Sequence, residues 1–165
     1  MIDHIIFDVD GTLTDGGIII DSVGTESKRF HDSDGLIIRE LPKLGFTTMI
    51  ITGRKSECTQ IRAKDLDITV IFQGVKDKEK LLKEYFAKHQ LCGERCAYIG
   101  NDLNDFSAMR LCVFKACPND AVKEIRGLCN YVANAKAGYG ATREICEFLL
   151  QRQGKYEEFL ARFGM

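Results

Sequence analysis

The chain has 165 residues, of which 45% are hydrophobic and 28% are charged, and its formal net charge is −1. This length and composition predict one globular domain over residues 1–165, large enough to bury a hydrophobic core. The balanced charge gives no reason to expect nucleic acid or an anionic membrane as a partner, and no apolar run approaches the roughly 20 residues of a membrane span. Because no signal peptide is recognisable and the seven cysteines form an odd set, we expect a cytoplasmic protein with free thiols.

Short apolar runs alternate along the chain with longer amphipathic ones. The first run, residues 5–7, predicts a buried strand that ends at Asp8 and Asp10. Residues 18–20 and 27–30 flank a turn-like stretch, which predicts a β-hairpin within about residues 17–31. A helix is expected over residues 34–44, closed by Gly45. Further strands are expected at 46–51, 69–72, 96–99, 112–116 and 131–132. Further helices are expected at 56–66, 76–90, 121–128, 142–153 and 156–163, and one more follows residues 100–105 and ends at 110.

This alternation predicts an α/β fold with a mostly parallel sheet. Polar residues follow three of the predicted strands: Asp8 and Asp10 the first, Thr52 the second, and Asn101 and Asp102 the fourth. In an open parallel sheet these strand ends lie on one edge, where ligands bind. We therefore expect these side chains to converge on one site.

The two carboxylates at Asp8 and Asp10 point to a cation. Burying two acids beside an apolar strand is costly unless a positive charge lies between them, and Mg²⁺ prefers carboxylates, water and phosphate oxygens. Asp10 and Gly11 could instead form a hairpin turn. An EF-hand loop is excluded, because Leu13 and Ile19 occupy the positions of its required Gly and Glu.

The segment D-V-D-G-T-L-T, residues 8–14, resembles the first motif of the haloacid dehalogenase superfamily. By this resemblance Asp8 is the nucleophile that becomes an aspartyl-phosphate, and Asp10 is the general acid and base. The resemblance also implies a Rossmann-like, three-layer α/β/α fold with a parallel sheet. It further implies Mg²⁺ as the cofactor, with Asp8 and Asp10 among its ligands.

Two later segments match further motifs of the superfamily. Thr52 alone would be read as a helix N-cap, but the resemblance places its hydroxyl on the transferring phosphoryl group, beside Gly53 and Arg54 in a substrate-binding loop. The guanidinium of Arg54 suits an anionic substrate. Lys78 alone belongs to a solvated charge run, but the resemblance makes it the lysine that neutralises nucleophile and phosphate, with Lys76 as the competing candidate.

Residues 100–105, G-N-D-L-N-D, match the last motif with one departure. On their own they could cap a helix. In the superfamily the residue after the glycine is usually an Asp that binds Mg²⁺, whereas here it is Asn101, whose amide oxygen can coordinate but carries no charge. Asp102 could be the ligand instead, and Asp105 could position Lys78. The sequence therefore does not determine how strongly the site binds Mg²⁺.

Residues 15–35 and 138–144 narrow the resemblance to a capless subgroup, whose members are phosphatases of 3-deoxy-D-manno-octulosonate 8-phosphate and of nonulosonate 9-phosphates. The resemblance to this subgroup implies a phosphomonoesterase that acts on a sugar-acid phosphate. The expected substrate is 3-deoxy-D-manno-octulosonate 8-phosphate, and N-acylneuraminate or a related nonulosonate 9-phosphate is the alternative. The resemblance also places Arg143 among the residues that contact the substrate. It also implies a homotetramer in which a neighbour's hairpin and C-terminal tail, about residues 137–165, close the site and exclude water.

A non-catalytic reading comes from the same resemblance, because related domains fused to acylneuraminate cytidylyltransferases can serve in oligomerisation alone. Asn101 favours that reading. The intact set of Asp8, Asp10, Thr52 and Lys78 argues against it.

Overall fold

A six-stranded parallel sheet forms the centre of the computed structural model, which describes all 165 residues. Each strand pairs in parallel with its neighbours. The first strand of the chain lies inside the sheet, with later strands added on both sides of it. The strand order is β5 (Val70–Phe72), β4 (Thr47–Ile51), β1 (His4–Phe7), β6 (Cys96–Ile99), β7 (Phe114–Cys117) and β8 (Tyr131–Val132).

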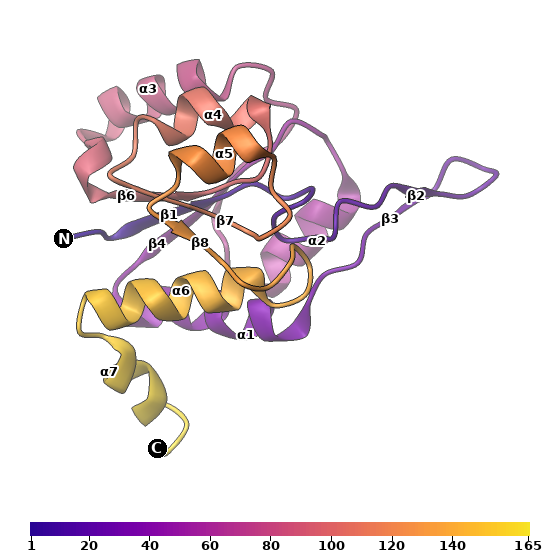
Figure 1. The fold of residues 1–165 in the computed structure, drawn as a ribbon. Helices are drawn as coiled ribbons and strands as arrows, with labels where there is room; N and C mark the ends of the chain where they lie inside the picture. Colours follow the sequence, from indigo (N-terminus) through magenta and orange to yellow (C-terminus); the bar gives the residue numbers. More distant parts are fainter.

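Helices cover both faces of the sheet and make three layers (Figure 1). Successive side chains of a strand point to opposite faces, so Ile5 and Phe7 enter a core of 24 buried residues and Ile6 a second core of 13. The predicted α/β fold is confirmed. The helices on the first core are α1 (Asp32–Glu40), α2 (Glu57–Asp65) and α6 (Ala141–Arg152), and those on the second are α3 (Lys78–His89), α4 (Leu103–Met109) and α5 (Lys123–Leu128).

Several element boundaries differ from the predicted ones. The helix expected at 34–44 begins at Asp32 and ends at Glu40, where a 3₁₀ helix, η1 (Leu41–Leu44), takes over. Pro42 explains the change, because it has no N–H to donate to an α-helical carbonyl but fits the first turn of a new helix. A second 3₁₀ turn, η2 (Gly93–Arg95), precedes β6. The strand expected at 112–116 and the helix expected at 121–128 both begin two residues later.

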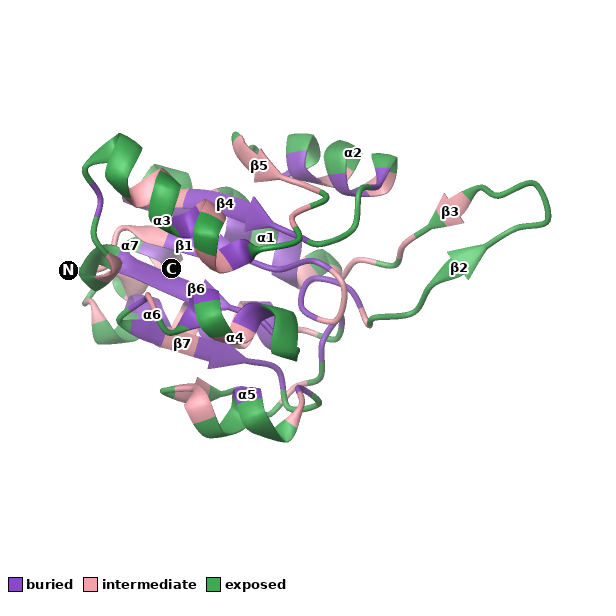
Figure 2. Cartoon of the chain, turned by 90° about the horizontal axis from the view of Figure 1, so that it is seen from above, coloured by how far each residue is buried: buried purple, intermediate pink, exposed green.

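A β-hairpin projects from the carboxyl edge of the sheet (Figures 1 and 2). We call residues 17–31 the flap, as predicted, although its paired strands, β2 (Ile19–Ile20) and β3 (Glu26–Ser27), are only two residues long. A bridge between Thr14 and Phe30 closes its base. The chain carries no cap domain, so this flap is the main structure that overhangs the sheet edge.

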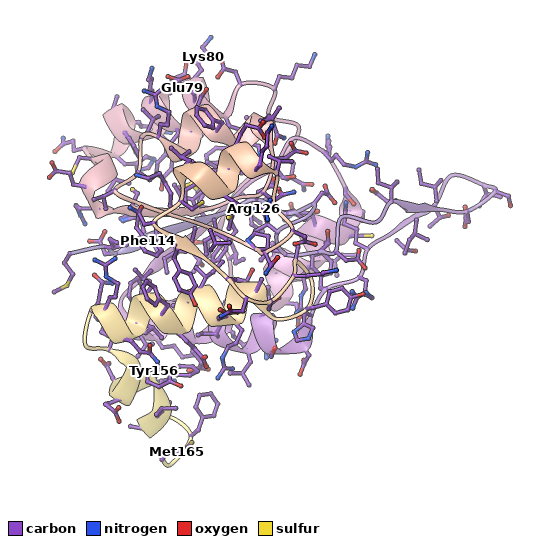
Figure 3. All side chains as sticks on the ribbon, viewed as in Figure 1. Glu79, Lys80, Phe114, Arg126, Tyr156 and Met165 are labelled. Carbon is purple, nitrogen blue, oxygen red and sulfur yellow. The ribbon has the colours of Figure 1, made fainter.

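The C-terminal tail packs against its own chain. Helix α6 lies along α1, and α7 (Tyr156–Ala161) docks through Phe159, which is fully buried. Lys155 Nζ donates to the carbonyl oxygen of Leu44 at 2.5 Å, and Arg162 pairs with Glu40. Figure 3 shows Tyr156 and Met165 at this end of the molecule. No helix of the structure combines the length and the apolar character that a bilayer crossing requires.

Candidate active site

Asp8 lies where β1 ends, in the middle of the carboxyl edge of the sheet. Its backbone N–H donates to the carbonyl oxygen of Ile99 at 3.0 Å, which ties the segment to β6. The chain then turns sharply, because the N–H groups of residues 12–14 all donate to the carbonyl oxygen of Val9. The strand and this turn leave the Asp8 residue only 4% exposed. A carboxylate so buried needs partners of opposite charge.

Lys78 supplies that charge from the first residue of α3. Its Nζ donates to Asp8 Oδ1 at 2.7 Å and to Asp105 Oδ1 at 2.6 Å. Asp77 caps the helix by accepting from the Lys80 N–H, which sets the first turn so that Lys78 faces inward. Glu79 and Lys80, its neighbours, lie at the outer surface of α3 (Figure 3). Lys76 is exposed, so Lys78 is the lysine that meets the aspartates.

Two carboxylates therefore share one ammonium group inside the protein. Burial and the charge of Asp105 raise the pKa of Asp8 to about 7, although Lys78 acts to lower it. Burial alone would lower the pKa of Lys78, but the charges of Asp8 and Asp105 outweigh it and raise that pKa. Tyr98 also donates to Asp105 Oδ1 at 3.0 Å. Asp105 is thus held by several donors and is itself fully buried, which makes it a support for Lys78.

Thr52 follows β4, the strand next to β1, and is 1% exposed. Its backbone N–H donates to Phe72 and its carbonyl oxygen accepts from Val75, so both neighbouring loops fix its position. A cleft of about 440 Å³ opens beside it, with no hydrophobic residue in its lining. The cleft is lined by Asp8, Asp10, Thr52, Gly53, Arg54, Asp102 and Asn104.

The loop before α4 borders the cleft on the β6 side. Asp102 caps α4 by accepting from the Leu103 N–H at 2.7 Å, and Asp105 accepts from the backbone N–H of Asn101 and Asp102 in return. Gly100 is required here, because a Cβ atom would lie 2.7 Å from the Asp105 carboxyl group. Asp102 therefore both caps α4 and lines the cleft, so the two interpretations of this segment hold together.

The flap adds contacts that the sequence analysis missed. Lys28 reaches the carboxylate of Asp10, and its Nζ lies 3.4 Å from Glu26 Oε1. Arg54 donates to the same Glu26 carboxylate at 2.9 Å. The signal was present as the E-x-K pattern of the flap, but nothing in the sequence showed that the flap folds back over Asp10. Asn104 in the cleft wall lies within the 100–105 motif, but the sequence analysis gave it no role.

Comparison with known proteins now identifies the relationship. No family model matches the chain. A 3-deoxy-D-manno-octulosonate 8-phosphate phosphatase (KdsC) of Yersinia pestis is 38% identical over 153 residues, which are 93% of this chain and 82% of that protein. The chain belongs to the 3-deoxy-D-manno-octulosonate 8-phosphate phosphatase family. This membership confirms the expected enzyme class, a phosphatase.

Solved structures agree with this KdsC family membership. A Moraxella catarrhalis 3-deoxy-D-manno-octulosonate 8-phosphate phosphatase, crystallised with magnesium, phosphate and KDO, is 40% identical with a TM-score of 0.94, covering 98% of this chain and 93% of that one. A Legionella pneumophila structure described as a haloacid dehalogenase superfamily hydrolase of subfamily III A is 32% identical with a TM-score of 0.90, covering 94% and 86%. The predicted superfamily and its Rossmann-like fold are confirmed.

The oxygen atoms at the end of β1 and in the loop before α4 of this chain can be compared with the ligands that a magnesium ion requires. No three His, Cys, Asp or Glu side chains are placed so that they could hold a metal ion by themselves, so other oxygens must contribute. One terminal atom of the Asn101 amide lies 3.1 Å from Asp8 Oδ2 and 3.2 Å from the carbonyl oxygen of Asp10. Neighbouring ligand oxygens of an octahedral Mg²⁺ are about 3 Å apart, since each lies about 2.1 Å from the metal. Asp8, the Asp10 carbonyl and Asn101 therefore fit a magnesium ion.

Arg143, a predicted substrate contact, does not line the cleft of its own chain. Its Nε pairs with Glu147 at 2.5 Å, and its guanidinium lies over the ring of Phe159, 5.1 Å from the centroid. The physical reason is that Glu147, one turn further along α6, offers a charge, and Phe159 of α7 offers an aromatic ring beside the start of α6. A role at the site of another copy stays a prediction.

Proposed function

We propose that this phosphatase hydrolyses 3-deoxy-D-manno-octulosonate 8-phosphate with Mg²⁺ through an aspartyl-phosphate on Asp8. The observation that carries the proposal is the buried Asp8 carboxylate at the floor of a polar cleft, held by Lys78 and bordered by Thr52. The names of the relatives support this substrate. An N-acylneuraminate or related nonulosonate 9-phosphate is the alternative, because it offers the same carboxylate and phosphate.

In the first step Asp8 attacks phosphorus in line, a P–O(Asp8) bond forms, and the bond from phosphorus to the sugar oxygen breaks. Asp10 gives its proton to that leaving oxygen. Thr52 and Lys78 donate to the phosphoryl oxygens, on which charge spreads in the transition state. In the second step a water molecule attacks phosphorus, Asp10 takes its proton, and Asp8 is released together with inorganic phosphate.

Asp8, the Asp10 carbonyl and Asn101 would hold the magnesium ion, and Asp102 borders the same space. When bound, the ion neutralises phosphate charge and orients the phosphoryl group. The carboxylate of the sugar acid finds a guanidinium in Arg54, which lines the cleft beside Gly53. Lys28 holds the Asp10 carboxylate in place from the flap.

We further propose that the flap completes the site in a homotetramer. Ile18, Ile19 and Ile20 are each more than half exposed, and so is Val23 near the tip. An apolar strand edge of this kind favours pairing with another chain. Asp8, Asp10 and Thr52 line one cleft and Lys78 pairs with Asp8, which argues against the non-catalytic alternative that Asn101 favours.

The test is phosphate release from 3-deoxy-D-manno-octulosonate 8-phosphate and N-acetylneuraminate 9-phosphate, each with Mg²⁺ and with EDTA. We expect metal-dependent turnover of the first. Faster phosphate release from N-acetylneuraminate 9-phosphate would make that compound the substrate. No phosphate release from either compound by a folded protein would refute the proposal.

Asp8→Asn is the matching variant. Asn has nearly the same shape and still accepts a hydrogen bond from Lys78, so the fold should persist while turnover falls by at least about a thousandfold. Far-UV circular dichroism and the melting temperature check the fold. Activity within tenfold of the wild type would remove Asp8 from its role as nucleophile.

A further inference from the structure

The side-chain amide of Asn101 is surrounded almost entirely by oxygen atoms. One of its terminal atoms lies 3.1 Å from Asp8 Oδ2, 3.1 Å from Thr12 Oγ1 and 3.2 Å from the carbonyl oxygen of Asp10. If that atom is the nitrogen, it donates to these acceptors. If it is the oxygen, it accepts only from the Thr12 hydroxyl and faces two other oxygens, an arrangement that is stable only with a cation between them.

Without a cation the surroundings favour the donor orientation of this amide, because the opposite one leaves its nitrogen facing only donors, but nothing blocks the rotation between them. The Asn101 backbone is fixed, because its N–H donates to Asp105 and its carbonyl oxygen accepts from Val122, each at 3.0 Å. The Thr12 hydroxyl can donate to an amide oxygen or accept from an amide nitrogen. Gly11, at a φ of +83°, makes the room, since a Cβ atom there would lie 2.2 Å from the Asn101 amide. A half-turn of the amide plane exchanges the two states without moving the backbone.

When no cation is bound, the negative charges around Asn101 favour the orientation in which its amide N–H donates to Asp8, which we call the donor state. Asp8, Asp10 and Asp105 bring three carboxylates to this edge, against the ammonium groups of Lys78 and Lys28. An additional carboxylate beside Asp8 would add repulsion and no donor. An amide adds no charge and supplies a hydrogen bond, but it attracts a cation less strongly than a carboxylate does.

We propose that Asn101 is a two-state group, donating an amide N–H to Asp8 when the site holds no cation and turning to present its oxygen when Mg²⁺ binds. The chain thereby keeps a stable metal-free form at the expense of metal affinity. This inference rests on the proposed metal dependence of the site. It concerns binding and stability, however, and its test needs no substrate.

The experiment compares Asn101→Asp, Asn101→Ala and the wild type in full-length protein without substrate. Isothermal titration with MgCl₂ gives the Kd, and melting temperatures are measured in EDTA and in Mg²⁺. Asn101→Asp should melt lower than the wild type in EDTA and bind Mg²⁺ at least about tenfold more tightly. Asn101→Ala should melt lower in EDTA and bind Mg²⁺ more weakly. Asn104→Asp is the matched control, because it adds the same charge to the cleft wall beside Gly53, where Asn104 makes no hydrogen bond with Asp8, and its Kd should change less than about threefold.

A direct readout is the ¹⁵N-labelled side-chain amide signal that disappears in Asn101→Ala. It should shift on Mg²⁺ titration as the N–H groups leave Asp8. An unchanged melting temperature in EDTA for both Asn101 variants would overturn the donor state, and an unchanged Mg²⁺ affinity would overturn the ligand state. If the wild type hydrolyses neither sugar-acid phosphate but the binding pattern holds, the proposed function fails and this inference stands.

Discussion

The buried charge centre and the flap differ in how complete they are within one chain. Asp8, Lys78, Asp105 and Tyr98 are each no more than 4% exposed, and each finds its hydrogen-bond partners in the same chain. The flap is held by four paired strand residues, and its isoleucines at 18–20 are more than half exposed. The charge centre therefore depends on the sheet and its flanking helices, whereas the flap side of the cleft depends on a segment that the single chain leaves partly exposed.

This contrast separates two kinds of substitution. Changes in the charge centre should affect both stability and catalysis, since the same buried groups serve both. Changes in the flap should affect the substrate side and assembly, with little effect on the folding of the sheet. The flap reaches the cleft through Lys28, which pairs with Asp10, and through Glu26, which pairs with Arg54.

Lys78→Met should show the largest effect. It leaves Asp8 and Asp105 buried without a counter-charge, which typically costs about 3–5 kcal/mol of the free energy of unfolding. Phosphate release should also be lost. Urea denaturation and the phosphatase assay measure the two effects on one preparation.

Lys76→Met is the control for that experiment, because Lys76 lies two residues away and is exposed. Its unfolding free energy should change by less than about 0.5 kcal/mol, with activity kept. Equal losses in the two variants would mean that the buried pairing of Lys78 does not support the site.

Glu26→Gln should have an intermediate effect, on the flap alone. The nearby Ser56 hydroxyl lowers the pKa of Glu26, burial opposes it, and Arg54 and Lys28 lower the pKa further. Because these are partly exposed contacts worth about 0.5–1 kcal/mol, amide hydrogen exchange over residues 18–30 should speed up roughly two- to fivefold. Glu57→Gln, an exposed change on α2, is the control and should leave this exchange unchanged.

The same Glu26 contacts predict a pH dependence. A lowered carboxyl pKa means that the contribution is complete above the ordinary Glu value of about 4.3 and is lost as the pH falls through the lower value of the folded state. After correction for intrinsic exchange, flap protection in the wild type should be constant between about pH 8 and 5. It should approach that of Glu26→Gln below about pH 4. Protection that declines already at pH 6 would point to another group.

The order of strands and helices could be predicted because each leaves a periodic signal of its own, and the site loops follow strand ends. The pairing of Lys78 with Asp8 followed from a motif, and the support from Asp105 was anticipated. Other contacts depend on how separate elements pack. Lys28 is 18 residues from Asp10 and meets it only because the flap folds back. The contacts of Arg143 with Glu147 and Phe159 within its own chain could not be predicted, because no motif marks the packing of α7 beside α6.

Ile19→Ala should show the smallest effect in a single chain and the most informative one in an assembly. Ile19 is 54% exposed, so in dilute solution its removal should change the unfolding free energy by less than about 0.5 kcal/mol, against about 2–5 kcal/mol for Ile6→Ala in the core. If the flap packs against other copies, the wild type should gain urea resistance with rising protein concentration and the variant should gain less. Light scattering follows the mass in parallel. A deficit that is equal at every concentration would place the partner of Ile19 inside its own chain, and no deficit at any concentration would exclude the flap as an interface.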